Sequence, residues 1–220
     1  MAGCCDLRGY ETVFGPSRAR ANAERYRRKG LDPTARRMVD YLRSRGLAGC
    51  TVLEVGGGVG AIQLELLRDG AASAVNVELS AGYESVAREL LEEAGLAERV
   101  ERHLLDFARE AHALEPADLV VMHRVVCCYP DMHALVAAAA ERAGRRLAMS
   151  FPRDVWWVRL GIRAENLWQR LRRRAFRAYL HPPPALLAAA ESHGLRPAFG
   201  HRGWVWQAVV LERAATEPGS

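Results

Sequence analysis

The chain has 220 residues, of which 50% are hydrophobic and 26% charged, an ordinary globular composition at a length that can bury one core. No apolar run approaches the ~18 residues needed to span a bilayer, and the first residues lack the layout of a secretory signal, so we expect a cytoplasmic protein. The net charge of +5 comes from 31 basic residues of which only Lys29 is lysine; because this indicates biased coding composition as much as selection for charge, we expect no nucleic-acid partner.

Residues 1–45 predict an N-terminal cap segment. Residues 1–15 are expected to be irregular. Two helices are predicted after them, over 17–29 with Ser17 as N-cap, and over 34–45. The second helix follows a break at 30–33 and is capped by Asp32 or a neighbour.

Residues 46–213 predict an alternating α/β domain. Strands are expected over 51–55, 74–78, 99–107, 117–123 and 145–151, and helices over 60–69, 80–94, 131–143 and 185–193. An insertion at 153–180 carries an amphipathic helix over 154–177. Strands near 195–201 and 204–212 would add an antiparallel hairpin, and the tail 214–220 is expected to be disordered.

The segment from Val52 to Gly60 indicates a nucleotide-cofactor site, because glycines between a strand and a helix let the backbone approach a ligand. Two cofactors fit its spacing. In the dinucleotide pattern, Gly56, Gly58 and Ala61 are the fingerprint and Glu78 is the ribose-binding acid. Alternatively, Glu-x-Gly-x-Gly-x-Gly resembles the first motif of class I S-adenosylmethionine (SAM) methyltransferases.

Acidic residues at the ends of three successive strands favour the methyltransferase. Glu54 precedes the glycine turn, and Glu78 and Asp106 lie at the ends of the next two predicted strands. The resemblance implies a Rossmann-like seven-stranded sheet with helices on both faces, an N-terminal cap and a helix inserted after strand five. It also implies which residues bind SAM: for the methionine end Glu54, Gly56, Gly57, Gly58 and Gly60, for the ribose Glu78 and Leu79, for the adenine Asp106 and Phe107, with His123 beside them.

The loop 123–131 follows strand four, where this fold places the methyl acceptor. It lacks the Asn/Asp-Pro-Pro-aromatic motif of many N-methylating relatives, which counts against a nucleic-acid substrate. Segments resembling magnesium-protoporphyrin O-methyltransferases are Val125–Pro130, Ser150–Pro152, Arg177–His181, and Gly9–Glu11 with Phe14-Gly15. Because Cys128 replaces that family's histidine, we expect a relative with another small-molecule acceptor.

Candidate catalytic residues are His123, Cys128, Tyr129 and Tyr10. His123 is either a base or a cap for strand four, and the two tyrosines either orient the acceptor or stack against cofactor and lid. His181 either lines the pocket or lies at the surface.

The paired cysteines suggest a further hypothesis. Cys4, Cys5, Cys127 and Cys128 are predicted to lie near the methyl site, where they either bind a soft metal, supply a thiolate or are small buried hydrophobes. Adjacent pairs lack the Cys-x-x-Cys spacing of zinc sites, and no metal is assigned.

The inserted helix has three interpretations: a lid over a hydrophobic substrate, packing against the core, or docking on an anionic membrane. Together these features predict SAM-dependent methylation of a small, apolar or planar metabolite, with oxygen favoured as the acceptor atom. The alternatives are a SAM-binding sensor or scaffold without catalysis, and a nucleic-acid methyltransferase.

Overall fold

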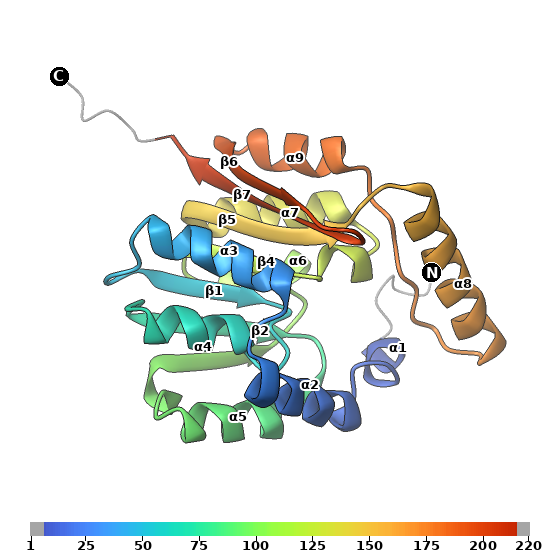
Figure 1. Ribbon diagram of the computed structural model, residues 1–220, viewed down its shortest axis with the longest axis horizontal. Coiled ribbons are helices and arrows are strands. Elements are labelled where there is room, and N and C mark those ends of the chain that lie inside the picture. Colours follow the sequence, from blue (N-terminus) through green and yellow to red (C-terminus); the bar gives the residue numbers. More distant parts are fainter. Residues whose placement is uncertain (1–6, 215–220) are drawn as a thin grey trace.

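The computed structural model describes residues 7–214 and is built around one seven-stranded sheet of order β3-β2-β1-β4-β5-β7-β6 (Figure 1). The strands are β1 Thr51–Val55, β2 Ser73–Glu78, β3 Val100–Leu104, β4 Ala117–His123, β5 Ala143–Pro152, β6 Leu195–Arg202 and β7 Trp206–Arg213. The first five are parallel, and β7 pairs antiparallel with both β5 and β6. The predicted fold class and its closing hairpin are confirmed.

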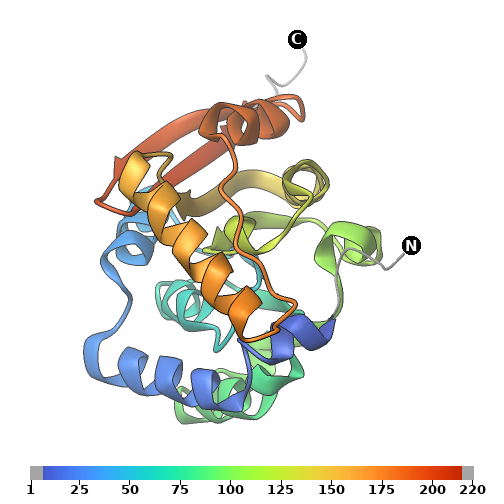
Figure 2. The same ribbon diagram turned by 90° about the vertical axis from the view of Figure 1, so that its right-hand side faces the viewer.

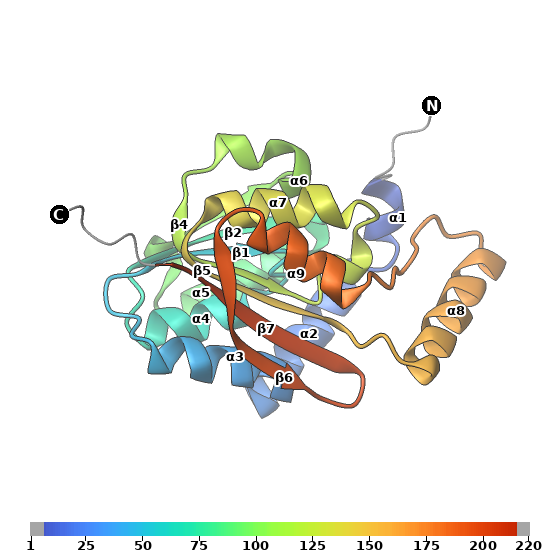
Figure 3. The ribbon, with the colours of Figure 1, turned by 90° about the horizontal axis from the view of Figure 1, so that it is seen from above.

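Helices cover both faces of the sheet, as Figure 3 shows. Against one face lie α2 Pro16–Lys29, α3 Pro33–Ser44, α4 Ala61–Arg68 and α5 Glu84–Glu93; against the other lie α6 Phe107–Glu110, α7 Met132–Arg142 and α9 Pro183–Glu191. Strand β4 runs between the two apolar cores, and Leu119 to Met122 are fully buried. A central parallel strand is apolar on both sides for this reason.

The sheet order reverses between β1 and β4. Both strands are parallel and their carboxyl ends lie together, while the chain leaves them toward opposite sides of the sheet. Such a switch point opens a crevice in which α/β proteins bind ligands. The position of the predicted site therefore follows from the topology.

The N-terminal segment differs from the prediction in two places. The structure has a short helix, α1 Leu7–Glu11, where irregular chain was expected. Helix α2 begins at Pro16 with Gly15 as N-cap and no side-chain cap, so the prediction of Ser17 as N-cap is wrong. Proline fits the first turn of a helix because its φ is preset and its missing N–H would have had no partner.

Asp32 caps α3 as predicted. Its side chain accepts hydrogen bonds from the backbone N–H groups of Thr34, at 3.0 Å, and Ala35, at 3.3 Å. Elsewhere β3 is shorter than expected because Phe107 already belongs to α6, and α5 is preceded by a 3-10 turn, Ala81–Tyr83. Further 3-10 turns are Ala97–Arg99, Ala111–Ala113 and Val126–Cys128.

The inserted helix, α8 Trp156–Leu171, is shorter than the predicted 154–177. It ends before the run Arg172–Arg174, in which Arg173 has a positive φ of 54°. The interpretation that its apolar stripe packs against the core is wrong, because Leu160, Leu167 and Leu171 are exposed. No helix in the described part of the chain has the length and apolarity to cross a membrane. Residues 215–220 of the predicted tail 214–220 and the pair Cys4-Cys5 lie outside the described residues.

Candidate functional site

A cavity of about 570 Å³ lies at the carboxyl ends of the central strands, a size typical of small-molecule sites. Its floor is the turn after β1 and its walls include the ends of β2 and β4. Residues of α1, α2 and the segment after α8 line its outer side. Figure 2 shows α1 and α2 at the same end of the molecule as the chain that follows α8. The sheet and the N-terminal cap segment therefore line the same cavity.

The glycine turn has a backbone that side chains would disrupt. Gly56, Gly58 and Gly60 have φ values of 61°, 56° and 78°, in the left-handed region that favours glycine. A Cβ on Gly56 would lie 2.6 Å from Cγ2 of Val125, and one on Gly57 would lie 2.2 Å from Nδ2 of Asn76. The turn is thus held against its neighbours on one side and open to the cavity on the other.

Glu54 lies buried beneath this turn and also lines the cavity. Its Oε2 accepts a hydrogen bond from the backbone N–H of Gln63, at 3.1 Å, in the first turn of α4. Burial raises the pKa of Glu54 to about 8, although this hydrogen bond and the nearby Arg102 lower it. The neutral form of this carboxyl group is therefore favoured at pH 7, and a cation bound beside it would favour the ionised form.

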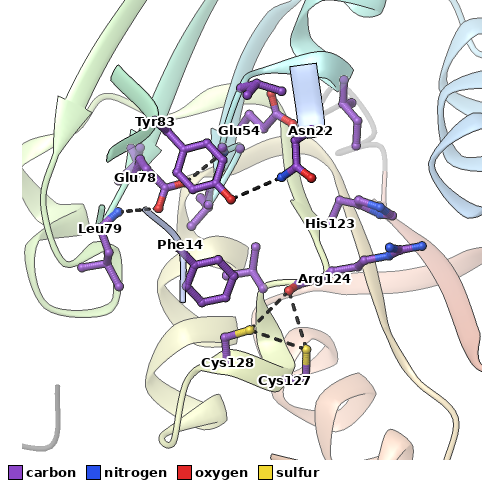
Figure 4. A pocket seen from close by; sticks show the side chains of 18 of the residues that line it. Phe14, Asn22, Glu54, Glu78, Leu79, Tyr83, His123, Arg124, Cys127 and Cys128 are labelled. Carbon is purple, nitrogen blue, oxygen red and sulfur yellow. Dashed lines mark hydrogen bonds between the residues drawn. The ribbon is translucent and has the colours of Figure 1, made fainter. Parts of the chain in front are cut away.

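Glu78 ends β2 and faces the turn, as Figure 4 shows. Its carboxylate accepts hydrogen bonds from the backbone N–H groups of Gly58 at 2.9 Å, Leu79 at 2.8 Å and Ser80 at 3.2 Å. Burial raises the pKa of Glu78 despite these bonds. The three donors fix the orientation of the carboxylate at the cavity wall.

Asp106 follows β3 and contacts the loop after β4 through Tyr129. The hydroxyl of Tyr129 donates to its carboxylate at 3.0 and 3.2 Å, and Arg109 lies 3.5 Å from it. Phe107, the next residue, is buried and lines the cavity. Tyr129 thus links the end of β3 to the loop after β4.

His123 ends β4 and is held at both ring nitrogens. Nε2 lies 2.8 Å from Oδ2 of Asp32, and Nδ1 lies 2.8 Å from Oγ of Ser150. Asp32 only accepts, so Nε2 bears a proton, and the Ser150 hydroxyl can donate to Nδ1. Burial alone would raise the pKa of Asp32. The pKa nevertheless lies below its usual range, because Asp32 has a hydrogen bond to His123 and lies near the charges of His123 and Arg124.

Arg124 is a site residue that the sequence did not reveal. Its φ is 61°, its backbone N–H donates to Ser150 Oγ at 3.0 Å, and its guanidinium lies 3.3 Å from Asp32 and 4.6 Å from the ring centre of Trp206. Trp206 and Arg124 both line the cavity. The only available signal was the position of Arg124 immediately after strand four.

An aromatic cluster forms the outer wall. The ring of Tyr10 lies 6.0 Å from that of Phe14 and 5.8 Å from that of Phe176, and Phe14 and Phe176 are 5.4 Å apart. The hydroxyl of Tyr10 donates to the carbonyl of Cys128. Tyr10 was predicted at the site, whereas Phe14 was known only from the resemblance and Phe176 was not expected there.

The two described cysteines of the loop lie side by side, with their sulfur atoms 3.8 Å apart. Both thiols contact the carbonyl of Arg124 (Figure 4). The neighbouring Cys127 and burial raise the pKa of Cys128, so its thiol stays protonated at neutral pH. In residues 7–214 no three metal-ligating side chains converge, and the four-thiol hypothesis stays a prediction because Cys4 and Cys5 are not described.

The predicted residues converge on one place. The cavity is lined by Tyr10, Glu54, Gly56, Gly57, Gly58, Glu78, Leu79, Asp106, Phe107, His123, Cys128 and Tyr129. Gly60 is not among the lining residues; it is the N-cap of α4. His181 lies outside the cavity lining and donates from Nε2 to the carbonyl of Tyr129 at 2.9 Å.

Sequence and structure comparisons agree with this geometry. Residues 52–146 match a family model described as a methyltransferase domain. No curated protein matches the chain significantly.

Solved structures share the fold across most of the chain. Magnesium protoporphyrin IX methyltransferase from Synechocystis PCC 6803, with bound SAH, has a TM-score of 0.70 and 20% identity, over 94% of this chain and 98% of that one. An O-methyltransferase family protein from Burkholderia thailandensis has a TM-score of 0.68 and 19% identity, over 94% of this chain and 64% of that one. An O-methyltransferase family 2 protein from Planctomyces limnophilus, in complex with apigenin, has a TM-score of 0.61 and 17% identity, over 84% of this chain and 63% of that one.

Identities this low establish the fold alone. The family model covers the glycine turn and the three acids at strand ends. Residues 52–146 of the chain therefore match a methyltransferase domain, and the described residues have a class I methyltransferase fold.

Proposed function

We propose that this protein methylates an oxygen atom of a small, planar or apolar metabolite. One observation carries the proposal: the three strand-end carboxylates and an aromatic wall line the same cavity. The carboxylates suit a polar nucleoside cofactor, and the rings suit a flat or apolar acceptor. A single space that offers both kinds of surface matches a two-substrate transfer.

The residues around the glycine turn fit SAM. We assign the methionine end to Glu54 with Gly56, Gly57, Gly58 and Gly60, the ribose to Glu78 and Leu79, and the adenine to Asp106 and Phe107, with His123 at the edge of the cofactor site. The fit is supported by the turn, where added Cβ atoms at Gly56 and Gly57 would clash with Val125 and Asn76. Bound SAM supplies an activated, electrophilic methyl group.

Glu54 would recognise the positive charge of the methionine end. Its pKa of about 8 means that the carboxyl group is largely neutral at pH 7 in the free protein. A cation placed next to it favours the ionised form. Binding would therefore be accompanied by loss of a proton from Glu54.

His123 and Asp32 would hold the proton that a hydroxyl acceptor loses. To transfer its proton, the acceptor hydroxyl would take the place of Ser150 beside Nδ1, because the buried Ser150 now occupies that nitrogen and does not line the cavity. The carboxylate of Asp32, 2.8 Å from Nε2, would stabilise the charged ring. His123 is the sole histidine among the described residues that line the cavity.

The outer wall would align the acceptor. Tyr10 would hold the acceptor loop through its bond to the Cys128 carbonyl and would present its ring beside Phe14 and Phe176. Tyr129 would position Asp106, and the Cys128 thiol would pack against the acceptor. The protoporphyrin and apigenin named in two of the neighbouring structures support a planar acceptor.

Calorimetry followed by a transfer assay tests the proposal. The protein is titrated with SAM and then incubated with labelled SAM and a panel of phenols, carboxylic acids and amines. We expect SAM binding that weakens by at least tenfold in Glu78→Ala, because the hydrogen bonds between the ribose hydroxyls and the carboxylate are lost. We also expect methyl transfer to an oxygen acceptor.

Each other result excludes the proposal in a different way. Absence of SAM binding removes the cofactor assignment. SAM binding without transfer to any acceptor favours a sensor or scaffold, and RNA or DNA binding that falls steeply with salt favours a nucleic-acid substrate.

A further inference from the structure

The exposed large apolar side chains of the described residues gather in one place. Apart from Leu104, they are the set that we call the α8 face: Trp156, Leu160, Leu167, Trp168 and Leu171 on α8, with Trp204 and Val205 at the tip of the β6–β7 hairpin. Trp156 is 71% exposed, Leu171 74% and Trp204 77%. A contiguous apolar area of this kind marks an interaction surface, whereas single exposed hydrophobic residues do not.

The helix and the hairpin form one continuous surface. The ring of Trp157 lies 5.7 Å from that of Trp156 and 6.4 Å from that of Trp204. Positions 156, 160, 167 and 171 follow the helical repeat and lie along one side of α8. Figure 2 shows α8 running across this end of the molecule from the hairpin toward α1.

The opposite side of α8 makes its contacts with the protein. Val158 and Gln169 are buried, and Glu165 lines the cavity. Asn166 anchors the returning chain by two hydrogen bonds of 2.8 Å with the backbone of Ala178. The helix is therefore attached mainly by its other side, and most of the apolar surface of the α8 face stays exposed.

The net charge around this face is positive. Residues 151–180 contain eight arginines and two acidic residues. Of the acids, Asp154 is paired with Arg159 at 2.6 Å and Glu165 lines the cavity. Arg159, Arg163 and Arg170 follow one flank of the apolar stripe at helical spacing, and Arg172 and Arg174 lie 4.6 and 5.2 Å from the ring of Trp168.

We propose that the α8 face docks on an anionic lipid membrane. A helix with tryptophan and leucine on one side and arginine beside them lies in the headgroup region, with its apolar side toward the acyl chains. Tryptophan favours this boundary because its ring is apolar and its N–H is polar. A second copy of the chain is a poorer partner, because pairing two such faces would bring both arginine rows together.

Vesicle flotation of the full chain tests the proposal. Vesicles are made from phosphatidylcholine alone or from phosphatidylcholine with phosphatidylglycerol, at low and at physiological salt. We expect binding to the anionic vesicles that weakens with salt, and a blue shift of tryptophan fluorescence on binding. Arg163→Gln with Arg170→Gln is expected to weaken binding by about thirtyfold, since each basic residue near an anionic surface contributes roughly fivefold.

Leu160→Glu with Leu167→Glu is expected to abolish binding, while Leu104→Glu, at an exposed leucine outside the face (62%), leaves it unchanged. An unchanged thermal unfolding midpoint shows that the double variant is folded. The proposal is overturned if the protein fails to bind anionic vesicles at low salt, or if Leu104→Glu weakens binding as much as the pair does. Sedimentation could instead show that the protein is a dimer. If the Leu160 and Leu167 changes dissociate this dimer while anionic vesicles leave it intact, the proposal is also overturned.

Discussion

Nε2 of His123 lies 2.8 Å from Oδ2 of Asp32, which joins the end of β4 to the N-cap of α3. Oδ1 of the same carboxylate accepts the two capping hydrogen bonds of α3 and lies 3.3 Å from Arg124. One side chain thus connects the N-terminal segment to the loop that follows the central strand. Proton chemistry and stability are coupled at this point.

Asp32→Asn tests that coupling. Asparagine keeps a capping oxygen and loses the charge, so we expect a loss of about 1–2 kcal/mol of unfolding free energy at pH 7. Because the folded pKa of Asp32 is held below its ordinary value, its stabilisation is present above that value and is lost as the pH falls. Urea unfolding should therefore show the two proteins converging in acid; a pH-independent difference would contradict the ionic contribution.

Glu54→Gln separates binding from stability. The folded pKa of about 8 lies above that of an unfolded chain, so the folded protein binds more protons and loses stability as the pH rises toward 8. The amide removes this cost, and we expect the free variant to be more stable than the wild type at pH 8 by on the order of 1–3 kcal/mol.

The same variant should bind SAM more weakly. In the wild type, affinity should rise as the pH increases toward 8, because the carboxylate form pairs with the cation. Calorimetry in buffers of different ionisation enthalpy measures the released proton. Equal proton release by Glu54→Gln and the wild type would contradict the role of Glu54.

Gly56→Ala tests the glycine turn. Gly56 has a positive φ, and an added Cβ would lie 2.6 Å from Val125. We expect SAM affinity to fall by more than tenfold, since both backbone strain and a displaced loop result. Gly46→Ala is the matched control, because Gly46 has a φ of +80° with no atom within 4 Å of the added Cβ; it should cost about 1 kcal/mol of stability and leave binding unchanged.

Cys128 should behave as an unreactive thiol. Its pKa is raised by Cys127 and by burial, and the thiolate is the form that alkylating reagents attack. We expect iodoacetamide to modify Cys128 more slowly than free cysteine at pH 7, as followed by mass spectrometry. Rapid modification, or loss of transfer in Cys128→Ser with SAM binding intact, would revive a thiolate role.

The sequence by itself determined the fold class and the meeting of three acids at one cavity. Glu54, Glu78 and Asp106 were predicted from their place at the ends of strands, because carboxyl ends of neighbouring parallel strands meet at one edge of a sheet. Their clustering depends on strand order alone, and each strand was recognisable from its local apolar pattern. The capping role of Asp32 was local in the same sense.

Only the tertiary structure decided the outer wall of the cavity and the partner of His123. Phe176 reaches Tyr10 and Phe14 from more than 160 positions away in the chain, and Asp32 reaches His123 across 91 residues. The amphipathic pattern of α8 had the same limit, since it specifies an apolar side and leaves open whether that side faces the core or the solvent. In this protein the polar contacts of Asn166 and the buried Val158 and Gln169 turn the apolar side outward.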